Sequence, residues 1–564
     1  MAIKKYQLVL TLVFLGMTLV GAIGLNTYPA DLVRETHGTV ASDGVYISFN
    51  LYHKAGIPDN CPVIVIGHGI MVNKEYMSNF AIEIAARGNF LVASLDWRGE
   101  GQSGGAVSNS LYLDLEAVIN IIPSLMPTAN MSAIGLVGFS MGGGPTFQYA
   151  VNHTEVRAWV GVATTPDGNV GNTTNPKNVL AIKGEDDEAF SSDRLLTAMM
   201  NLTNSASISD VLVNHEYGSI AAGTARKIKI IPLADHLTAT WDPIFTADVT
   251  DWMVRTFYGI TPDLTFMVYH IRVILLLVGL TGLVGIVYGI ALLIARAEKF
   301  HNTVDAKAPA GQGKIAPALF KDLSTNAFVG RYYAWTLGLI PTVAIPAASI
   351  LIPMFLTSIM VILNGWLAIN LLIYSWRLLK KRGCSVKKII MEDLAQKKAW
   401  ILGAIITPVF VTGFYFMVGM NYLGSMPPVP RFPFVIIYGV TFFVLFYIFA
   451  FFNEQITASF VKSKSRFKDD KVTYVVQSLV SFGLIYSWFF AIIMTACALM
   501  QSMFFAIFLI LMIPIFLFMA FAGNYLHRLT LSSVPNALLQ SVLITLLVVT
   551  LSPIGSMFGA FMHF

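Results

Sequence analysis

The sequence predicts two domains of different fold class: a mostly parallel, doubly wound α/β sheet over residues 27–263, and an all-α, multi-span transmembrane domain over residues 264–564. The first region alternates short apolar runs with amphipathic segments, as strands alternating with helices do. The second consists mainly of apolar runs of roughly 20 residues, the length of a membrane-spanning helix. Hydrophobic residues make up 55% of the chain and charged residues 12%, which excludes a purely soluble, disordered or nucleic-acid-binding protein.

The chain begins with an apolar segment at residues 6–26, preceded by Lys4 and Lys5. Such a segment is either a cleaved signal peptide or an uncleaved anchor. Its apolar length of roughly 18 residues and the lack of a clean small-residue cleavage pattern favour the anchor. We therefore expect residues 1–26 to form an N-terminal transmembrane anchor.

Eight further spans follow in the second region. The run from Tyr333 to Trp376 has no charged residue over 44 positions, and prolines interrupt it, so it is divided into two spans. The eight expected spans are 265–295, 332–354, 357–378, 400–420, 433–453, 473–497, 502–522 and 537–560. Together with the anchor they make nine spans, which places the two termini on opposite sides of the membrane.

The charges predict the orientation of the chain. Residues 27–263 hold 13 basic and 24 acidic residues, a net charge of −11, whereas residues 264–564 have a net charge of +14. Basic loops stay on the cytoplasmic side. These loops are 296–331, 377–399, 454–471 and 523–536, whereas the predicted outer loops of the second region carry only Arg272 and Arg431. We expect a cytoplasmic N-terminus, with the α/β domain and the C-terminus extracytoplasmic.

The elements of the α/β domain alternate in the order that a parallel sheet requires. A continuous apolar run such as residues 61–67 is typical of a strand buried on both faces. The expected strands are 61–67, 90–95, 134–138, 158–163, 179–183 and 227–232, and the expected helices are 79–87, 111–122, 142–151 and 242–258. This order predicts a parallel sheet with helices on both faces.

One motif within this order is typical of a catalytic site. Gly138–Gly142 reads G-F-S-M-G and lies between an apolar strand and a glycine-rich helix start. A sharp turn at this place exposes the Ser140 hydroxyl above the sheet edge, and small glycines allow the neighbouring backbone to pack closely. The alternative is a chance turn, but the strand before it and the helix after it favour a nucleophilic serine.

The chain resembles the α/β-hydrolase superfamily over about residues 37–260, most closely its serine-aminopeptidase, monoacylglycerol-lipase and dienelactone-hydrolase-like branches. His68-Gly69-Ile70 is similar to the family's HG turn, and residues 96–103 resemble its D-x-R-G-x-G-x-S segment. In that segment, Glu100 occupies the place where many members carry histidine. We expect His68 to stabilise the turn rather than to take part in catalysis.

The resemblance implies a Ser-His-Asp triad of Ser140, His236 and Asp187, in the order that this fold uses. Asp187 closes a G-x-x-D turn, and His236 follows the last strand. Asp186 and Asp167 remain alternatives for the acid. The backbone amides of Ile70 and Met141 are the implied oxyanion donors. No cofactor or metal is expected, and the three cysteines show no metal-binding spacing.

Two features bear on the substrate. Only about 15 residues, 164–178, separate two strands at the place where many esterases and lipases of this fold carry a helical lid, whereas residues 188–226 are long enough to cover part of the site. The interiors of the eight C-terminal spans are expected to lack charged residues, which argues against ion-coupled transport. An open site suits a bulky or membrane-bound substrate.

The sequence therefore predicts a membrane-embedded serine hydrolase that cleaves an ester, thioester or amide at the outer membrane face. Esterase activity is favoured over peptidase activity. Its expected partners are the lipid bilayer and a small-molecule, lipid or acylated envelope substrate. The alternative is a transport or interaction protein whose outer domain has a hydrolase fold without catalytic activity. The substrate, the role of the spans and the oligomeric state do not follow from the sequence.

Overall fold

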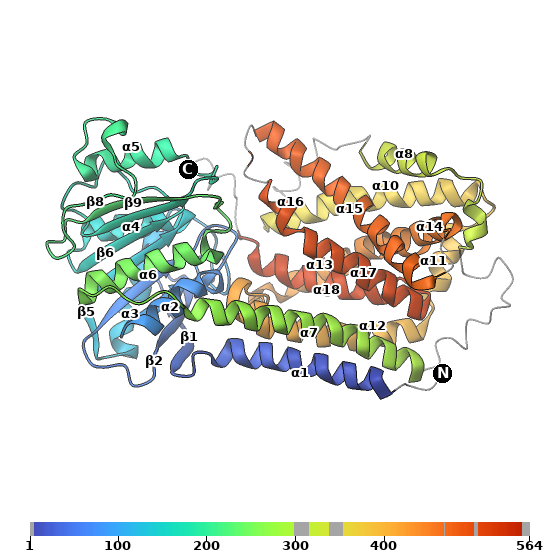
Figure 1. Cartoon of the computed structure of the whole chain (residues 1–564), viewed down its shortest axis with the longest axis horizontal. Helices are drawn as coiled ribbons and strands as arrows, with labels where there is room; N and C mark the ends of the chain where they lie inside the picture. Colours follow the sequence, from blue (N-terminus) through green and yellow to red (C-terminus); the bar gives the residue numbers. More distant parts are fainter. Residues whose placement is uncertain are drawn as a thin grey trace.

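The computed structural model describes residues 5–297, 315–337, 354–466, 469–500, 503 and 506–554. The chain forms two bodies that lie side by side (Figure 1). We call residues 32–258, which contain the sheet, the α/β lobe. The helices α1 and α7–α18 form the helical bundle. The lobe thus lies in sequence between two helices of the bundle, α1 (Lys5–Thr27) and α7 (Val268–Ala297).

Within the described residues, one nine-stranded sheet crosses the lobe in the order β1-β2-β4-β3-β5-β6-β7-β9-β8. The strands from β4 to β9 are parallel, and the antiparallel pairs are β1–β2, β2–β4 and β8–β9. The strands are β1 (Leu32–Val40), β2 (Tyr46–Lys54), β3 (Cys61–Gly67), β4 (Leu91–Leu95), β5 (Ala129–Phe139), β6 (Val156–Val162), β7 (Val179–Gly184), β8 (Glu216–Tyr217) and β9 (Arg226–Ile231).

The register of the parallel strands aligns their carboxyl ends. Gly67 at the end of β3 pairs with Leu95 of β4 and with Gly138 of β5, and Gly184 at the end of β7 pairs with Ile231 of β9. The loops that follow these strands therefore meet along one edge of the sheet. We call this edge the carboxyl edge.

Helices cover both faces of the sheet, as the predicted doubly wound fold requires. One buried apolar core joins the sheet to α3, α4 and α5, and a second joins it to α2 and α6. These helices are α2 (Ser78–Arg87), α3 (Leu111–Leu125), α4 (Gly143–Asn152), α5 (Ser192–Thr203) and α6 (Pro243–Tyr258). All six predicted strands and four predicted helices are present. The sequence did not predict β1, β2, β8 and α5.

The bundle contains π-helical as well as α-helical turns. Its described helices after α7 are α8 (Thr325–Thr336), α10 (Phe355–Lys380), α11 (Val386–Leu394), α12 (Lys397–Phe414), α13 (Phe432–Ala450), α14 (Ala458–Lys464), α15 (Asp470–Met500), α16 (Ile507–Leu511), α17 (Ile513–Thr530) and α18 (Val534–Leu551). A π-helical segment, Tyr415–Leu423, extends α12, and another, Phe451–Thr457, joins α13 to α14. π-helical turns are rare and occur frequently at functional sites.

Eight helices in the described part of the chain are long and apolar enough to cross a membrane. They correspond to eight of the nine predicted spans. Most of the remaining predicted span, 332–354, lies outside the described residues. Its first residues belong to α8, which begins at Thr325, inside the predicted loop 296–331.

The helices α1 and α7 run side by side along the bundle (Figure 1). Small residues allow this close packing, because a Cβ atom added to Gly21 would lie 2.3 Å from the Cα of Gly279. Farther along, a Cβ atom added to Gly289 would lie 2.4 Å from the Thr11 hydroxyl. Stripes of small residues are typical of helices that pack against one another in membranes.

The prediction that the spans carry no charged residue inside them is wrong. Arg272 lies within α7 and is buried, and Glu454 lies in the π-helical segment between α13 and α14. Hydropathy marks where an apolar run ends, but the helix continues beyond that point as long as its backbone hydrogen bonds continue. The side chain of Glu454 accepts a hydrogen bond from Asn536 Nδ2 at 2.5 Å.

The carboxyl edge of the sheet faces the bundle. The Arg431 guanidinium at the start of α13 donates to the carbonyl oxygen of Gly99, at 2.9 Å. On another part of the same edge, the indole of Trp241 stacks on the ring of Tyr422, with centroids 4.7 Å apart. The loops that follow the parallel strands therefore lie between the sheet and the end of the bundle.

Candidate active site

Ser140 occupies a strained turn between β5 and α4. Its φ of +49° lies in the left-handed region, which side-chain-bearing residues rarely adopt. A Cβ atom on Gly138 would lie 2.3 Å from Thr146 Oγ1, and one on Gly142 would lie 2.6 Å from the carbonyl oxygen of Gly67. Both glycines of the G-x-S-x-G motif are therefore required by close packing, and the turn holds the serine side chain above the sheet.

Three of the predicted residues form one hydrogen-bonded chain. Ser140 Oγ lies 3.0 Å from His236 Nε2, and His236 Nδ1 lies 2.9 Å from Asp187 Oδ2. Ser140 is partly exposed, whereas His236 and Asp187 are buried. The three side chains come from the loops after β5, β7 and β9, so the parallel sheet brings them together from distant parts of the chain.

The geometry distinguishes between the three candidate acids. Asp187 is buried against His236, and its second oxygen, Oδ1, accepts hydrogen bonds from the backbone amides of Ala189 and Phe190, at 3.0 and 3.1 Å. Asp186 and Asp167 are exposed. The resemblance favours Asp187, but the alternatives stayed open in the sequence because several acidic residues are adjacent in the 185–188 run.

Aromatic rings hold the imidazole of His236. The ring of Phe190 stacks on it, with centroids 5.6 Å apart, and the ring of Phe139 lies 5.3 Å away on centroids. The Tyr76 hydroxyl donates to the carbonyl oxygen of Leu237, which fixes the loop that carries the histidine. Burial raises the pKa of Tyr76 to about 12, so this hydroxyl remains a donor at neutral pH.

The HG turn lies directly beside the serine. A Cβ atom on Gly69 would come within 3.0 Å of the Ser140 Cβ, so no larger residue fits there. Ile70 follows in the turn, and Met141 begins the helical turn after the serine. Within the described part of the chain, the backbone amides of Ile70 and Met141 have no hydrogen-bond acceptor. Two amide donors next to the hydroxyl thus remain available for a ligand.

His68 has a structural environment. Its Nδ1 lies 2.6 Å from the carbonyl oxygen of Gly69, and its Nε2 accepts the backbone N–H of Trp97 at 3.1 Å. The Trp97 indole in turn donates to the His68 carbonyl oxygen at 2.7 Å. Complete burial lowers the pKa of His68 to about 4, so the ring is neutral at physiological pH. This is the structural role that we expect from the sequence.

A buried ion pair underlies the same turn. Lys74 Nζ lies 2.6 Å from Asp96 Oδ2, and the Lys74 backbone amide donates to Asp96 Oδ1 at 2.7 Å. Burial alone would raise the pKa of Asp96, but the ammonium of Lys74 lowers it overall. The sequence analysis missed Lys74, because a single lysine in a short helical turn has no pattern that marks it as buried.

Glu100 contacts the end of the HG turn. Its Oε1 accepts the backbone N–H of Met71 at 2.6 Å, and Met71 has a φ of +59°. Its Oε2 is buried and has no hydrogen-bond partner among the described residues. Burial raises the pKa of Glu100 well above its ordinary value. The Glu100 side chain therefore fixes the backbone of Met71, the residue that follows Ile70.

Loops of the bundle lie close to the site. The side chain of Glu188, next to the candidate acid, accepts a hydrogen bond from the backbone of Met503, which lies between α15 and α16. Residues 164–178 form no helix, as predicted for the absent lid, and α5 occupies part of the 188–226 stretch. Leu233, three residues before the histidine, is 92% exposed. At Glu188, a contact beside the site thus comes from the bundle.

No group of three or more histidine, cysteine, aspartate or glutamate side chains in the described part of the chain could hold a metal ion.

Part of the α/β lobe is similar to known proteins. Residues 62–196 match the model of the alpha/beta hydrolase fold family. Among solved structures, an esterase from Pyrococcus furiosus is 17% identical, covering 41% of this chain and 95% of the esterase, with a TM-score of 0.32. A protein of unknown function from Agrobacterium tumefaciens, described as a putative alpha/beta hydrolase, is 14% identical, covering 41% of this chain and 99% of that protein, with a TM-score of 0.32. No curated protein matches the chain.

The strand order of the sheet and the family model that matches residues 62–196 together identify the α/β lobe as a domain of the alpha/beta hydrolase fold, joined in one chain to a helical bundle that is rich in membrane-span-like helices.

Proposed function

We propose that the chain is a serine hydrolase in which Ser140, His236 and Asp187 form the catalytic triad. The observation that carries this proposal is the continuous hydrogen-bonded chain from Ser140 Oγ through the imidazole to Asp187. A neutral serine is a weak nucleophile and needs an adjacent base. His236 Nε2 lies within reach of the hydroxyl proton, and Asp187 holds the opposite ring nitrogen.

In the proposed mechanism, Ser140 Oγ attacks the carbonyl carbon of the substrate while His236 Nε2 takes its proton. The same nitrogen then returns the proton to the leaving group. Asp187 keeps the ring oriented and stabilises the imidazolium that forms. Water repeats the sequence on the acyl-enzyme and releases the acid. Burial of His236 and Asp187 strengthens their interaction.

The backbone amides of Ile70 and Met141 are the proposed oxyanion donors. Two facts support this role: the HG turn packs against the serine, and neither amide has an acceptor within the described chain. Loss of one such donor typically costs about 3 kcal/mol of transition-state stabilisation. Glu100 supports the turn through its hydrogen bond to Met71.

We further propose that the bundle spans the membrane with the lobe on the outer side, and that the substrate is an ester or thioester of a lipid or an acylated envelope molecule. The charge asymmetry between the basic cytoplasmic loops and the acidic lobe supports this orientation. The contacts between the carboxyl edge and the bundle support a membrane substrate, because a molecule that reaches Ser140 must pass close to the ends of the spans.

A fluorophosphonate probe tests the catalytic proposal. The purified full-length protein should be labelled by the probe, and Ser140→Ala should abolish labelling and reduce ester hydrolysis by at least about 10⁴-fold. Ser110→Ala, which changes a serine at the start of α3 whose side chain caps no amide, is the matched control and should be labelled normally. A folded wild-type protein that is not labelled would favour the alternative function, a transport or interaction protein with an inactive lobe.

A further inference from the structure

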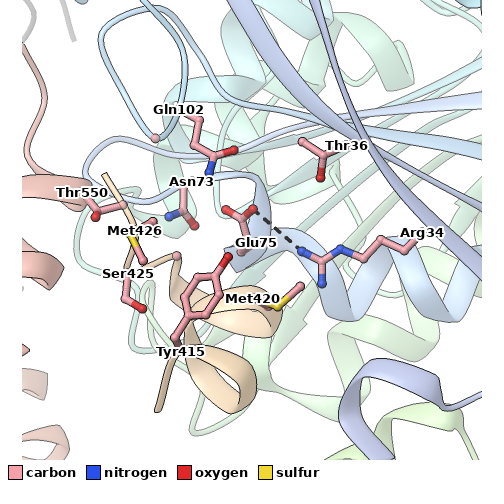
Figure 2. Close-up of a pocket in the computed structure, with 13 residues that line it drawn as sticks. Arg34, Thr36, Asn73, Glu75, Gln102, Tyr415, Met420, Ser425, Met426 and Thr550 are labelled. Carbon is pink, nitrogen blue, oxygen red and sulfur yellow. Dashed lines mark ion pairs between the residues drawn. The ribbon is translucent and has the colours of Figure 1, made fainter. Parts of the chain in front are cut away.

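A polar pocket, separate from the candidate active site, lies between the α/β lobe and the bundle (Figure 2). It contains about 420 Å³ of empty space, part of which is open to solvent. One wall comes from β1 and the loops after β3 and β4, and the other from the π-helical end of α12 and the loop that follows it. No described part of the proposed reaction uses this pocket.

The pocket is lined by charged and polar side chains of the lobe. Arg34 Nη2 and Glu75 Oε1 lie 3.9 Å apart, and Figure 2 shows both side chains directed into the space. The Arg34 guanidinium has no other acceptor among the described residues, and its remaining contact is with the ring of Tyr52. Several N–H groups of Arg34 are therefore available to an acceptor in the pocket.

Backbone close packing keeps the space empty. Gly424 lines the pocket with a φ of +57°, and a Cβ atom at this position would lie 2.2 Å from Asn73 Nδ2 and 3.3 Å from Glu75 Oε2. A Cβ atom added to Gly419 would lie 2.3 Å from Ser425 Oγ. Side chains at these two positions would collide with Asn73 and Ser425, which line the pocket.

The charges around the pocket balance. Arg34 and Glu75 are the charged side chains that line the pocket, and behind them Lys74 Nζ lies 3.4 Å from Glu75 Oε1 and 2.6 Å from Asp96 Oδ2. A site with a net charge near zero, in which a cation and a carboxylate lie side by side, favours a zwitterion over a simple anion.

The rim of the pocket is apolar on the bundle side. Met420 and Met426 line the pocket, and Met426 is 38% exposed. These residues belong to or follow the candidate span Lys397–Leu423. The pocket therefore offers a polar interior for a headgroup and an apolar rim along which acyl chains can lie.

We propose that this pocket binds the headgroup of a zwitterionic phospholipid, with the phosphate against Arg34 and the ammonium against Glu75. The bound lipid fills the joint between the lobe and the bundle. The inference rests on the proposed placement of the bundle in a bilayer but does not require Ser140 to be a nucleophile.

Lipid retention by the purified full-length protein tests the proposal. The Ser140→Ala background is used so that hydrolysis cannot consume the ligand. The protein is mixed with detergent micelles containing dioleoyl phosphatidylethanolamine and dioleoylglycerol in equal amounts, and bound lipid is counted by native mass spectrometry. We expect about one phosphatidylethanolamine per chain in preference to dioleoylglycerol, and Arg34→Gln should reduce its retention about tenfold.

Two further variants and one competitor complete the design. Arg157→Gln removes an exposed arginine on the lobe that hydrogen-bonds Ser132 and should retain as much lipid as the parent protein. Glu75→Gln should shift the preference from phosphatidylethanolamine toward anionic phosphatidylglycerol. This shift tests whether the pocket binds the zwitterionic headgroup even if Arg34→Gln fails to fold. Phosphorylethanolamine, which has no acyl chains, should compete only weakly.

Three results would overturn the inference: equal retention by Arg34→Gln and Arg157→Gln in folded proteins, no preference over dioleoylglycerol, or full competition by phosphorylethanolamine, which would indicate a soluble ligand. Fluorophosphonate labelling of the wild-type protein is read separately. A failure of the lipid site is therefore distinguishable from a failure of the proposed catalytic function.

Discussion

The α/β lobe and the helical bundle differ in the groups that surround their buried carboxyl side chains. In the α/β lobe, two buried carboxylates lie beside cations: Asp96 lies 2.6 Å from Lys74 Nζ, and Asp114 lies 2.6 Å from the Arg98 guanidinium. In the bundle, Asp393 and Glu454 are equally buried, but neither has a basic partner among the described residues. Neutral hydrogen-bond donors surround the bundle carboxyls instead.

The difference shows two uses for a buried acid. The pairs in the lobe lie directly behind the carboxyl edge, so they fix the loops that support the candidate active site. Asp393 instead ties helices together, because its Oδ2 accepts hydrogen bonds from Tyr447 Oη at 2.8 Å, Gln455 Nε2 at 3.0 Å and the backbone amide of Ser533 at 3.2 Å. The last contact caps the start of α18.

The largest expected effect on stability comes from breaking the buried ion pair of Lys74 and Asp96. Asp96→Asn leaves the ammonium of Lys74 buried with its closest carboxylate removed, which should reduce the free energy of unfolding by roughly 3–5 kcal/mol. For a domain of this size the unfolding temperature should fall by about 10 °C. Tryptophan fluorescence of the full-length protein during heating measures the change.

The exposed-loop variant Asp59→Asn is the control for that experiment, because Asp59 has no ion-pair partner among the described residues and is exposed. The double variant Asp96→Leu with Lys74→Met removes both charges and should recover part of the lost stability. An Asp96→Asn protein as stable as Asp59→Asn would contradict the idea that the pair is needed to fix the loop.

A second test uses pH. Burial lowers the pKa of His68 from its ordinary 6.5 to about 4 in the folded lobe, so only the unfolded chain takes up a proton on this residue between these two pH values. Stability should therefore decrease as the pH falls from 6.5 to about 4, by at most about 3 kcal/mol from this residue. Glu100, whose pKa is raised, acts in the opposite direction over part of the same range.

The contribution of His68 is isolated by comparison with His68→Gln, whose amide oxygen can still accept the Trp97 N–H. Glu100 contributes equally in both proteins, so the variant should lose less stability than the wild type between pH 6.5 and 4.5. Parallel stability curves for the two proteins would mean that the histidine is not held neutral by burial.

Much of the candidate site could be predicted from the sequence, because each of its parts follows a strand. Residues that directly follow the strands of a parallel sheet lie at its carboxyl edge. The sequence therefore placed Ser140, Asp187 and His236 at the same edge before their geometry was known. The choice of Asp187 over Asp186 needed the structure, because adjacent residues point in different directions and only one is buried.

Other features could not be predicted. The strands β1 and β2 lie at one side of the sheet, and β1 is largely exposed, so it lacks the continuous apolar run that identified β3. Arg431 contacts Gly99 from more than 300 positions away in sequence, and no local pattern indicates a contact between two domains. Glu454 was missed because the helix continues beyond the apolar run that defined the span.

The smallest expected effect is at Glu454. A buried carboxyl group without a cation is more stable when it is neutral, and a neutral glutamate has the shape and polarity of glutamine. Glu454→Gln should therefore keep the hydrogen bond from Asn536 Nδ2 and change the unfolding temperature by no more than about 2 °C. Asp393→Asn is the matched control, because the three donors around Asp393 Oδ2 require an acceptor and an amide NH₂ group in that place would oppose them. We expect Asp393→Asn to be clearly less stable than Glu454→Gln, whereas a large loss in Glu454→Gln would mean that this carboxyl is ionised and that its cation lies outside the described residues.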